Sequence, residues 1–215
     1  MKPTKHMLNN PKRKRTTIWF KNSYIFSLMC TLSIIISCSF SACHKAEPKY
    51  EYRKWEFSDG AIYAVAQYIP AAEHTVIEIP HSYKGYDVQF ILDGAFARSK
   101  IESLTMTSII KIYPEAFAFC DKLVTLNLGC VETIGRLAFG YCTALEKVVF
   151  PKSVETIEIG AFSDCKKLKA VYFEGNPENL SKDIFPPGVV IYGTPGGTVE
   201  LYAKQYGYEF RIINP

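Results

Sequence analysis

The sequence predicts an α/β solenoid of about four to five coils, made of short strands and short helical turns. Two observations predict it. An Ala-Phe pair recurs about every 22 residues, at Ala95-Phe96, Ala116-Phe117, Ala138-Phe139 and Ala161-Phe162. After each of the last three pairs, a cysteine, a leucine and an aliphatic residue follow at three-residue steps. Repetition in register is typical of a solenoid, because each unit is too small to bury its apolar face alone and must stack on its neighbours.

Each unit is predicted to supply one main strand. Leu126 and Leu128 alternate with polar residues, and the next two units repeat this alternation. A period of two is typical of a half-buried strand. A turn at Gly129 or Pro151 follows, and then a second short extended segment, V-E-T-I at 131–134. The Ala-Phe-x-x-Cys stretch is too short for a long helix, so we predict a helical turn with Phe and Cys pointing inward.

The first and fourth units depart from this pattern. The first unit fits if one residue is missing before Ile101, which places Ser99 near the cysteine position. The fourth unit keeps the pattern as far as Phe173 and then departs from it. We therefore assign the repeats to residues 76–173 and a C-terminal capping unit to residues 174–215.

The repeated motif resembles that of the BspA-like family of leucine-rich repeats. It reads A-F-x-x-C-x-x-L, then [LV]-x-[LF], a turn and V-E-T-I. The stretch TVIEIPHSYKGYDVQFILDGAF resembles the family's first unit. The stretch IYGTPGGTVELYAKQYGYEF resembles its closing unit, with a strand, a Gly-rich turn, a short helix holding Tyr202 and Tyr206, and a last strand. The resemblance implies a leucine-rich-repeat solenoid capped at both ends.

Residues 43–75 are predicted to form a linker and an N-terminal β cap. Trp55-Glu-Phe57 and Ile62-Tyr-Ala-Val65 flank Ser58-Asp59-Gly60, an arrangement typical of a hairpin. The alternative is a binding surface, because aromatic residues crowd this segment and bring large contact area at low entropic cost.

Residues 1–42 have the composition of a secretory signal peptide. Residues 1–21 hold seven basic residues and no acid, and residues 22–42 carry no charge. A basic region, an apolar run and a small-residue processing site follow one another in the order of such a signal. A retained signal anchor is the alternative, because about 20 uncharged residues can just span a bilayer.

Two cysteines lie at processing sites of lipoprotein type. Ser-Ala-Cys43 and Ile-Ser-Cys38 each place a small residue directly before the cysteine. Likeness to bacterial lipoproteins implies that this cysteine becomes the lipidated first residue of the mature chain. We favour Cys43, which adjoins a polar stretch, and keep Cys38 as the alternative. The expected location is the outer membrane or cell surface, with the chain anchored by lipid.

The charge balance argues against a nucleic-acid partner. The whole chain has 25 basic and 21 acidic residues, a net charge of +4. Loss of the seven basic residues of the signal leaves 18 against 21, a net charge of −3. A nucleic-acid-binding domain needs a clustered basic face, and no basic run remains after processing.

The sequence predicts no cofactor, no metal and no enzyme activity. Cys120, Cys142 and Cys165 recur at the repeat length, so they are predicted to form one column of buried packing residues, with a bridge between neighbours as the alternative. No C-x-x-C pair accompanies them, and common nucleophile, phosphate-loop and dinucleotide motifs are missing from the sequence.

The leading hypothesis is a surface-anchored module that binds a protein partner. Solenoids present a continuous strand-lined face suited to extended partners, and resemblance to the BspA-like family implies adhesion to host extracellular matrix or to other cells. The residues expected to point outward from the strands, and hence to bind, are Thr125, Asn127, Lys147, Val149, Ala170 and Tyr172.

Two alternatives remain beside adhesion. One is an envelope enzyme or accessory subunit with a cleft near the N-terminal cap, which would gather His74, His81 and a carboxylate such as Asp87 or Asp93. The other is a purely structural envelope component. The sequence leaves the oligomeric state open.

Overall fold

The computed structural model describes residues 49–57, 60–69 and 74–213. They belong to one compact unit, Lys45–Pro215. The segment Met1–His44 is a separate unit. The predicted signal peptide and both candidate lipidation cysteines therefore lie outside the described residues.

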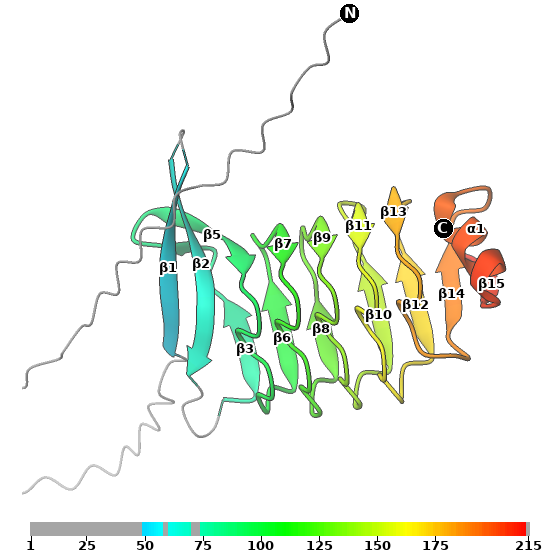
Figure 1. Ribbon diagram of the computed structural model, residues 1–215, viewed down its shortest axis with the longest axis horizontal. Helices are drawn as coiled ribbons and strands as arrows, with labels where there is room; N and C mark the ends of the chain where they lie inside the picture. Colours follow the sequence, from blue (N-terminus) through cyan, green and yellow to red (C-terminus); the bar gives the residue numbers. More distant parts are fainter. Residues whose placement is uncertain (1–48, 58–59, 70–73, 214–215) are drawn as a thin grey trace, which may run out of the picture. The chain divides into compact units, whose positions relative to one another are not determined.

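The described chain begins with a hairpin and continues as stacked coils (Figure 1). Strands β1 (Lys49–Phe57) and β2 (Gly60–Ile69) pair antiparallel, which is the hairpin that the sequence predicts. Strand β2 then pairs in parallel with β5 (Tyr86–Ile91), and the two-residue β4 (Ser82–Tyr83) pairs antiparallel with β5. The hairpin is thus joined to the first coil by backbone hydrogen bonds.

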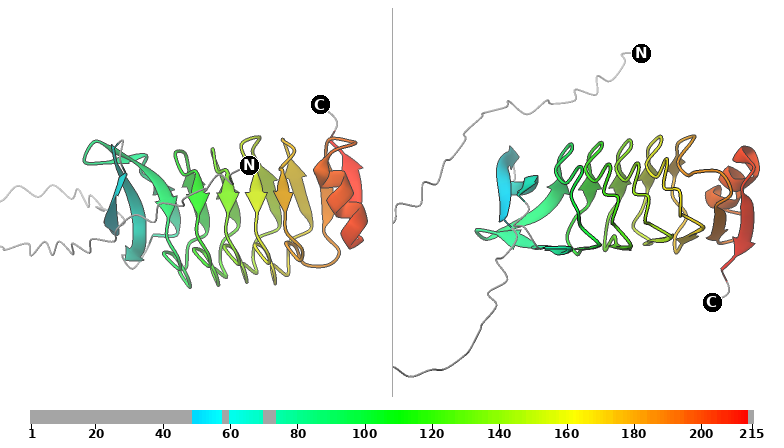
Figure 2. Two further views of the ribbon diagram at one scale, coloured as in Figure 1. Left: turned by 45° about the horizontal axis from the view of Figure 1, so that its top comes forward. Right: turned by 90° about the horizontal axis from the view of Figure 1, so that it is seen from below.

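The coils place their strands in two parallel rows (Figure 2). The main row forms two sheets and, from the second coil on, holds the longer strand of each coil. The first sheet contains β3 (Val76–Ile79), β6 (Ser103–Met106) and β8 (Thr125–Asn127). The second contains β10 (Lys147–Phe150), β12 (Ala170–Phe173), β14 (Val190–Gly193) and β15 (Glu209–Ile212). The second row continues from β5 through β7 (Lys111–Ile112), β9 (Thr133–Ile134), β11 (Thr156–Ile157) and β13 (Asn179–Leu180).

The alignment proposed for the first unit is confirmed by the strand register. Leu104 pairs with Leu126 in the main row, and Ile112 pairs with Ile134 in the second row. Ile101, at the point where one residue is missing, is fully buried. The shortened turn therefore does not shift the buried apolar residues of the first unit relative to those of the second, because the strands on either side of the turn keep their pairing.

The predicted helical turns at Ala-Phe-x-x-Cys are wrong. These stretches are turns, and the only α-helix among the described residues is α1 (Thr198–Tyr206), so the fold is mostly strand rather than α/β. The reason is the destination of the backbone hydrogen bonds. The N–H of Phe117 donates to the carbonyl of Ala138 at 2.8 Å, and that of Phe139 donates to Ala161 at 2.8 Å. The N–H groups that alternate with these donate three residues back, as Ala118 does to Glu115 at 3.0 Å. These alternating bonds leave no run of the i to i−4 bonds that an α-helix requires.

A continuous stack of six buried rings runs through the core. Neighbouring ring centroids lie 4.8 to 5.9 Å apart, and all are stacked. The rings belong to Tyr68, Phe96, Phe117, Phe139, Phe162 and Phe185. The Ala-Phe pairs predict the four central rings. Tyr68, whose N–H donates to Ala95 at 2.8 Å, and Phe185 extend the stack at its two ends without an alanine before them.

The cysteine column lies beside this stack. Cys120, Cys142 and Cys165 are fully buried and free. Each thiol donates a hydrogen bond of 3.2 to 3.3 Å to the carbonyl of the ring residue one coil before it. Ser99 takes the cysteine position in the first coil, with its Oγ 3.3 Å from the Sγ of Cys120. These contacts support packing as the role of the column.

The electrostatics of the column favour an unreactive thiol at its centre, whereas hydrogen bonding from Cys142 lowers the pKa of Cys120. Hydrogen bonding to the Cys120 thiol and then to the Cys165 thiol, together with burial, raises the pKa of Cys142 well above its ordinary value. Its thiol stays protonated at neutral pH, and the thiolate is the reactive form of cysteine.

The chain closes with β14, α1 and β15. Glu200 in the first turn of α1 accepts a 2.6 Å hydrogen bond from the N–H of Gly196, and Gly207 ends the helix at φ 76°. Tyr202 of this helix packs edge-on against the ring of Phe185, and burial raises its pKa. These elements follow the expected order of strand, Gly-rich turn, helix and strand.

Candidate functional site

The six residues predicted to bind a partner all lie on the main strand row. Thr125 and Asn127 are on β8, in the first sheet. The other four are on β10 and β12, in the second sheet, where the register sets Lys147 beside Ala170 and Val149 beside Tyr172. The structure therefore brings four of the six together by strand pairing and places the β8 pair on a separate sheet.

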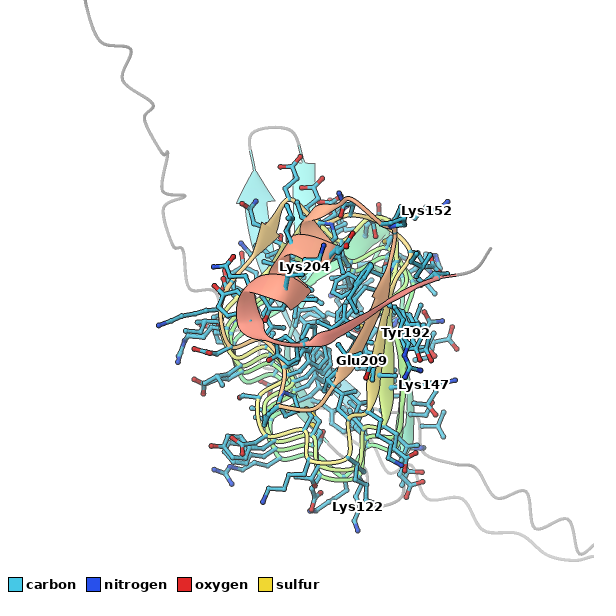
Figure 3. All side chains as sticks on the ribbon, turned by 90° about the vertical axis from the view of Figure 1, so that its right-hand side faces the viewer. Lys122, Lys147, Lys152, Tyr192, Lys204 and Glu209 are labelled. Atoms are coloured by element: carbon cyan, nitrogen blue, oxygen red, sulfur yellow. The ribbon has the colours of Figure 1, made fainter. Side chains whose placement is uncertain are left out.

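The six residues also differ in their exposure to solvent. Thr125, Asn127, Lys147 and Val149 are exposed, and the Val149 side chain is 41% exposed, which is high for an aliphatic residue on a strand. Ala170 and Tyr172 are half-buried. In Figure 3, Lys147 and Tyr192 project from this strand row, and Lys122 lies at the turn below it.

The surface continues onto β14 and β15, which the sequence prediction missed. Tyr192 pairs with Tyr172, and Arg211 pairs with Tyr192. The two tyrosine rings stack with centroids 4.5 Å apart and an interplanar angle of 16°. A usable signal was present, since V-Y-F at 171–173 and I-Y-G at 191–193 share an outward tyrosine after a buried aliphatic residue.

Arg211 fixes the end of this stack. Its Nη1 donates a 3.3 Å hydrogen bond to the Tyr192 hydroxyl, and its guanidinium lies 6.0 Å from the centroid of that ring. Its Nε lies 2.7 Å from a carboxylate oxygen of Glu209. Hydrogen bonds to Glu209 and then to Tyr192 raise the pKa of the guanidinium. We call Val149, Tyr172, Tyr192 and Arg211 the strand-face patch.

The strand-face patch has the chemistry of a protein-binding surface. Tyrosine and arginine are the residue types enriched at interface hot spots, because they combine a large contact area with hydrogen-bonding groups. Lys147 and Glu209 supply polar groups beside the apolar ring faces. The backbone beneath is a parallel sheet, so the side chains are held on a rigid support.

The structure does not bring together the residues named for the enzyme alternative. The ring of His81 contacts the hydroxyl of Ser82, and the carbonyl of His74 accepts a 3.4 Å hydrogen bond from Tyr68. Asp87 and Asp93 are exposed, and in the described part of the chain no hydrogen bond or ion pair joins either to a histidine. Neither of the two best-formed surface hollows of this part is lined by any of these four residues.

The described residues contain neither a metal-binding cluster nor a membrane-spanning helix. No group of three or more histidine, cysteine, aspartate or glutamate side chains within 74–213 and the hairpin is placed to hold a metal ion. Among the same residues, α1 is too short and too polar to cross a membrane.

The repeats match a known family model. Residues 74–187 match the BspA-type leucine-rich repeat region in six copies. This corrects the predicted count of four to five coils to about six and extends the repeats beyond Phe173. The unit beyond Phe173 escaped the sequence count because Phe185 stands there without an alanine before it. No match was found among curated proteins.

Solved structures of bacterial repeat proteins are similar to this chain. A leucine-rich repeat protein from Bacteroides capillosus is 32% identical, with a TM-score of 0.51, over 58% of this chain and 94% of that one. A leucine-rich repeat protein from Bacteroides ovatus is 22% identical, with a TM-score of 0.51, over 66% of this chain and 46% of that one.

A third similar structure is described as a leucine-rich cell surface protein, from Faecalibacterium prausnitzii. It is 18% identical, with a TM-score of 0.50, over 76% of this chain and 38% of that one. This chain thus spans less than half of the B. ovatus and F. prausnitzii proteins. Because the family match covers more than half of the chain, and the strand register repeats with the motif, this protein belongs to the BspA-type leucine-rich repeat family.

Proposed function

We propose that this protein is an exported bacterial surface protein that binds a protein partner through the strand-face patch. The observation that carries the proposal is the Tyr172–Tyr192 stack, which is closed at one end by Arg211 and flanked by the exposed Val149. Phe150 and Phe173 form a similar stack on the buried side of β10 and β12, whereas the tyrosine stack lies on the outer side. Both tyrosines are half-buried and take no part in the buried core. The hydroxyl of Tyr192 is held by Arg211.

Preorganisation favours binding at this patch. Stacking and the hydrogen bond to Arg211 limit the rotamers of Tyr192 before a partner arrives. Ordering a side chain at an interface costs on the order of 1 kcal/mol. A patch that is ordered in advance therefore gives up less of its interaction free energy on binding.

The proposed location rests on the N-terminal sequence and on a relative. Residues 1–42 have the composition of a signal peptide, and Cys43, or Cys38 in its place, is positioned for lipidation. The similar protein from F. prausnitzii is described as a cell surface protein. We infer that the repeats are displayed outside the cell on a lipid anchor, and that the partner is a host extracellular-matrix protein or a protein of another cell.

Binding to immobilised extracellular-matrix proteins tests the patch. We expect the purified full-length chain to bind, and a Tyr172→Ala, Tyr192→Ala double variant to bind about tenfold more weakly, as loss of a hot-spot pair predicts. Tyr206→Ala is the matched control, because this tyrosine is 39% exposed on α1, away from the strand row. If the double variant bound as tightly as the unsubstituted chain, the strand-face patch would not be the binding site.

Mass spectrometry of the native N-terminus tests export and anchoring. The expected mature chain begins at a diacylated or triacylated Cys43, and protease added to whole cells is expected to cleave it. A native chain that begins at Met1 would contradict processing, and a chain protected from external protease would contradict surface display.

A further inference from the structure

Two shallow surface hollows follow one another along the edge of the coils, and we call the two together the groove. The first, of about 280 Å³, lies over the early coils, and the second, of about 450 Å³, lies over the later ones. Two repeat positions line the whole of the first hollow, and the same positions line the second at Asp164 and Lys166, beside residues of the last coil. We call the residues two places after each ring of the core the exposed row: Arg98, Phe119, Tyr141 and Asp164. The residues two places further on are the polar row: Lys100, Asp121, Thr143 and Lys166.

Backbone hydrogen bonds between coils support this continuity. The N–H of Phe119 donates to the carbonyl of Gly140 at 2.8 Å, and that of Tyr141 donates to Ser163 at 2.8 Å. Consecutive members of each row therefore lie on adjacent coils. Asp164 and Lys166, which line the second hollow, follow in the rows directly after Tyr141 and Thr143, which line the first.

The exposed row is preorganised in an unusual backbone conformation. Arg98, Phe119, Tyr141 and Asp164 have φ values of 63°, 62°, 61° and 56°, in the left-handed region. That region favours glycine and asparagine, and bulky side chains there cost backbone strain. Phe119 and Tyr141 nevertheless stack at 4.5 Å with an interplanar angle of 8°, both about 40% exposed. Glu115, Leu137 and Asp183, at another position of the same turns, are left-handed as well, so this backbone belongs to the repeat, and the exposed aromatic pair is what distinguishes the row.

The groove has opposite charges at its two ends. Arg98 lies 4.4 Å from the Phe119 ring at the early end, and Asp164 and Asp183 line the late end. Lys100 is neutralised by Asp121, with contacts of 2.9 and 3.1 Å. Among the described residues, no ion pair engages Arg98, Asp164 or Asp183. The late end stays net acidic even with Lys166 beside the two aspartates.

We propose that this groove binds an extended segment of a partner protein in which an acidic, an apolar and a basic residue stand at positions i, i+2 and i+4. The acidic residue pairs with Arg98, the apolar residue covers the exposed edges of Phe119 and Tyr141, and the basic residue pairs with Asp164 and Asp183. The site is distinct from the strand-face patch and does not depend on it.

The spacing of the coils sets the spacing of this motif. Arg98 and Asp164 are three coils apart, or about 14 Å at the strand-to-strand spacing. Four residues of an extended chain span about 13 Å, and alternate side chains point to the same side.

Fluorescence anisotropy of labelled peptides on the full-length chain tests the proposal. The probe is Ser-Glu-Thr-Phe-Thr-Lys-Ser, blocked at both ends. Two matched controls carry glutamate at both charged positions or lysine at both. We expect the probe to bind at least threefold more tightly than either control, which is the scale of one exposed ion pair. Equal binding of all three peptides, or binding of none, would overturn the proposal.

Variants locate the binding and test each end of the groove. Phe119→Asn with Tyr141→Asn is expected to weaken the probe about tenfold, and asparagine keeps the left-handed backbone. In the Asp164→Asn, Asp183→Asn variant, we expect the probe to bind no more tightly than the control peptide with glutamate at both charged positions. Because the two aspartates are exposed, this pair remains a test even if the aromatic pair does not fold.

The strand face provides the control for location. Tyr172→Ala with Tyr192→Ala is expected to leave probe binding unchanged while it weakens binding of the matrix partner. Loss of the probe in this variant would place the peptide on the strand face and overturn the groove. Binding of glycans in place of the peptides, with loss in the Phe119→Asn, Tyr141→Asn variant, would overturn the assignment to a protein segment.

Discussion

Two rows of side chains run along this protein, only two residues apart in each of the four coils that carry an Ala-Phe pair. The buried stack repeats phenylalanine at Phe96, Phe117, Phe139 and Phe162, whereas the exposed row changes from arginine to phenylalanine, tyrosine and aspartate. Both stacks have ring spacings near 5 Å where rings are present. The difference shows that packing in the interior requires the same residue type in each of these coils, whereas at the groove the residue type can vary.

The largest expected effect comes from breaking the buried stack. Phe139→Ala is expected to lower the free energy of unfolding by about 3 to 5 kcal/mol, because the ring is fully buried between Phe117 and Phe162 and its loss leaves a cavity. Denaturant unfolding followed by circular dichroism measures it. Tyr141→Ala, two residues away in the exposed row, is the control. A comparable loss in the control would show that both stacks hold the fold.

The cysteine column is the next element to disrupt. Cys142→Ala is expected to cost about 1 to 2 kcal/mol near neutral pH, from a small cavity and the lost hydrogen bond to Phe117. Unfolding in a reducing buffer measures this cost. Cys130→Ala is the matched control, because that thiol is only half-buried and lies outside the column.

The raised pKa of Cys142 also predicts a pH dependence. Because the pKa is higher in the folded state than its ordinary value of 9.0, the unfolded chain gives up the proton first as pH rises. The stabilisation is complete below pH 9 and is lost at higher pH. The difference in unfolding free energy between wild type and Cys142→Ala should therefore shrink above pH 9. A difference that grows with pH would contradict the direction of the shift.

A smaller effect on stability is expected from a substitution that relieves backbone strain in the exposed row. Phe119→Asn should change the free energy of unfolding by less than about 1 kcal/mol, because relief of the left-handed backbone offsets the lost stacking on Tyr141. Thermal unfolding checks this expectation. Phe117→Asn, at the buried ring two residues earlier, should prevent stable folding. A large loss from Phe119→Asn would mean that the exposed row is structural.

The smallest effect belongs to the ion pair of the polar row. Lys100 and Asp121 are 2.9 Å apart, but their side chains are 69% and 45% exposed, so water screens their attraction. A double-mutant cycle of Lys100→Ala and Asp121→Ala should give a coupling of about 0.5 kcal/mol or less. A coupling several times larger would show that this pair fixes the early coils.

Most of the core could be predicted from the sequence, and the errors have a physical pattern. The ladder through Leu104, Leu126 and Val148 was visible because stacked coils demand similar apolar residues at each turn. The end rings Tyr68 and Phe185 were missed because a terminal coil has a neighbour on one side only, so an alanine before the ring is no longer required. The helical turns were mispredicted because inter-coil hydrogen bonds leave no visible mark in a short sequence.

The candidate surfaces were predicted less completely than the core. Lys147, Val149, Ala170 and Tyr172 were found from the strand period, but Tyr192 and Arg211 lie where the repeat spacing has ended. Their meeting depends on the pairing of β14 with its neighbours. The groove was missed altogether, because residues two places after each ring show no common residue type.

The repeat, its register and the buried ring of each central coil can be predicted from the amino-acid sequence alone, since burial selects the same apolar side chain wherever the surroundings repeat. The ends of the repeat, the backbone hydrogen bonds between coils and the meeting of variable side chains at the surface become visible in the folded chain. Those properties depend on contacts between residues about 20 positions apart, where the identity of one side chain places little constraint on the next.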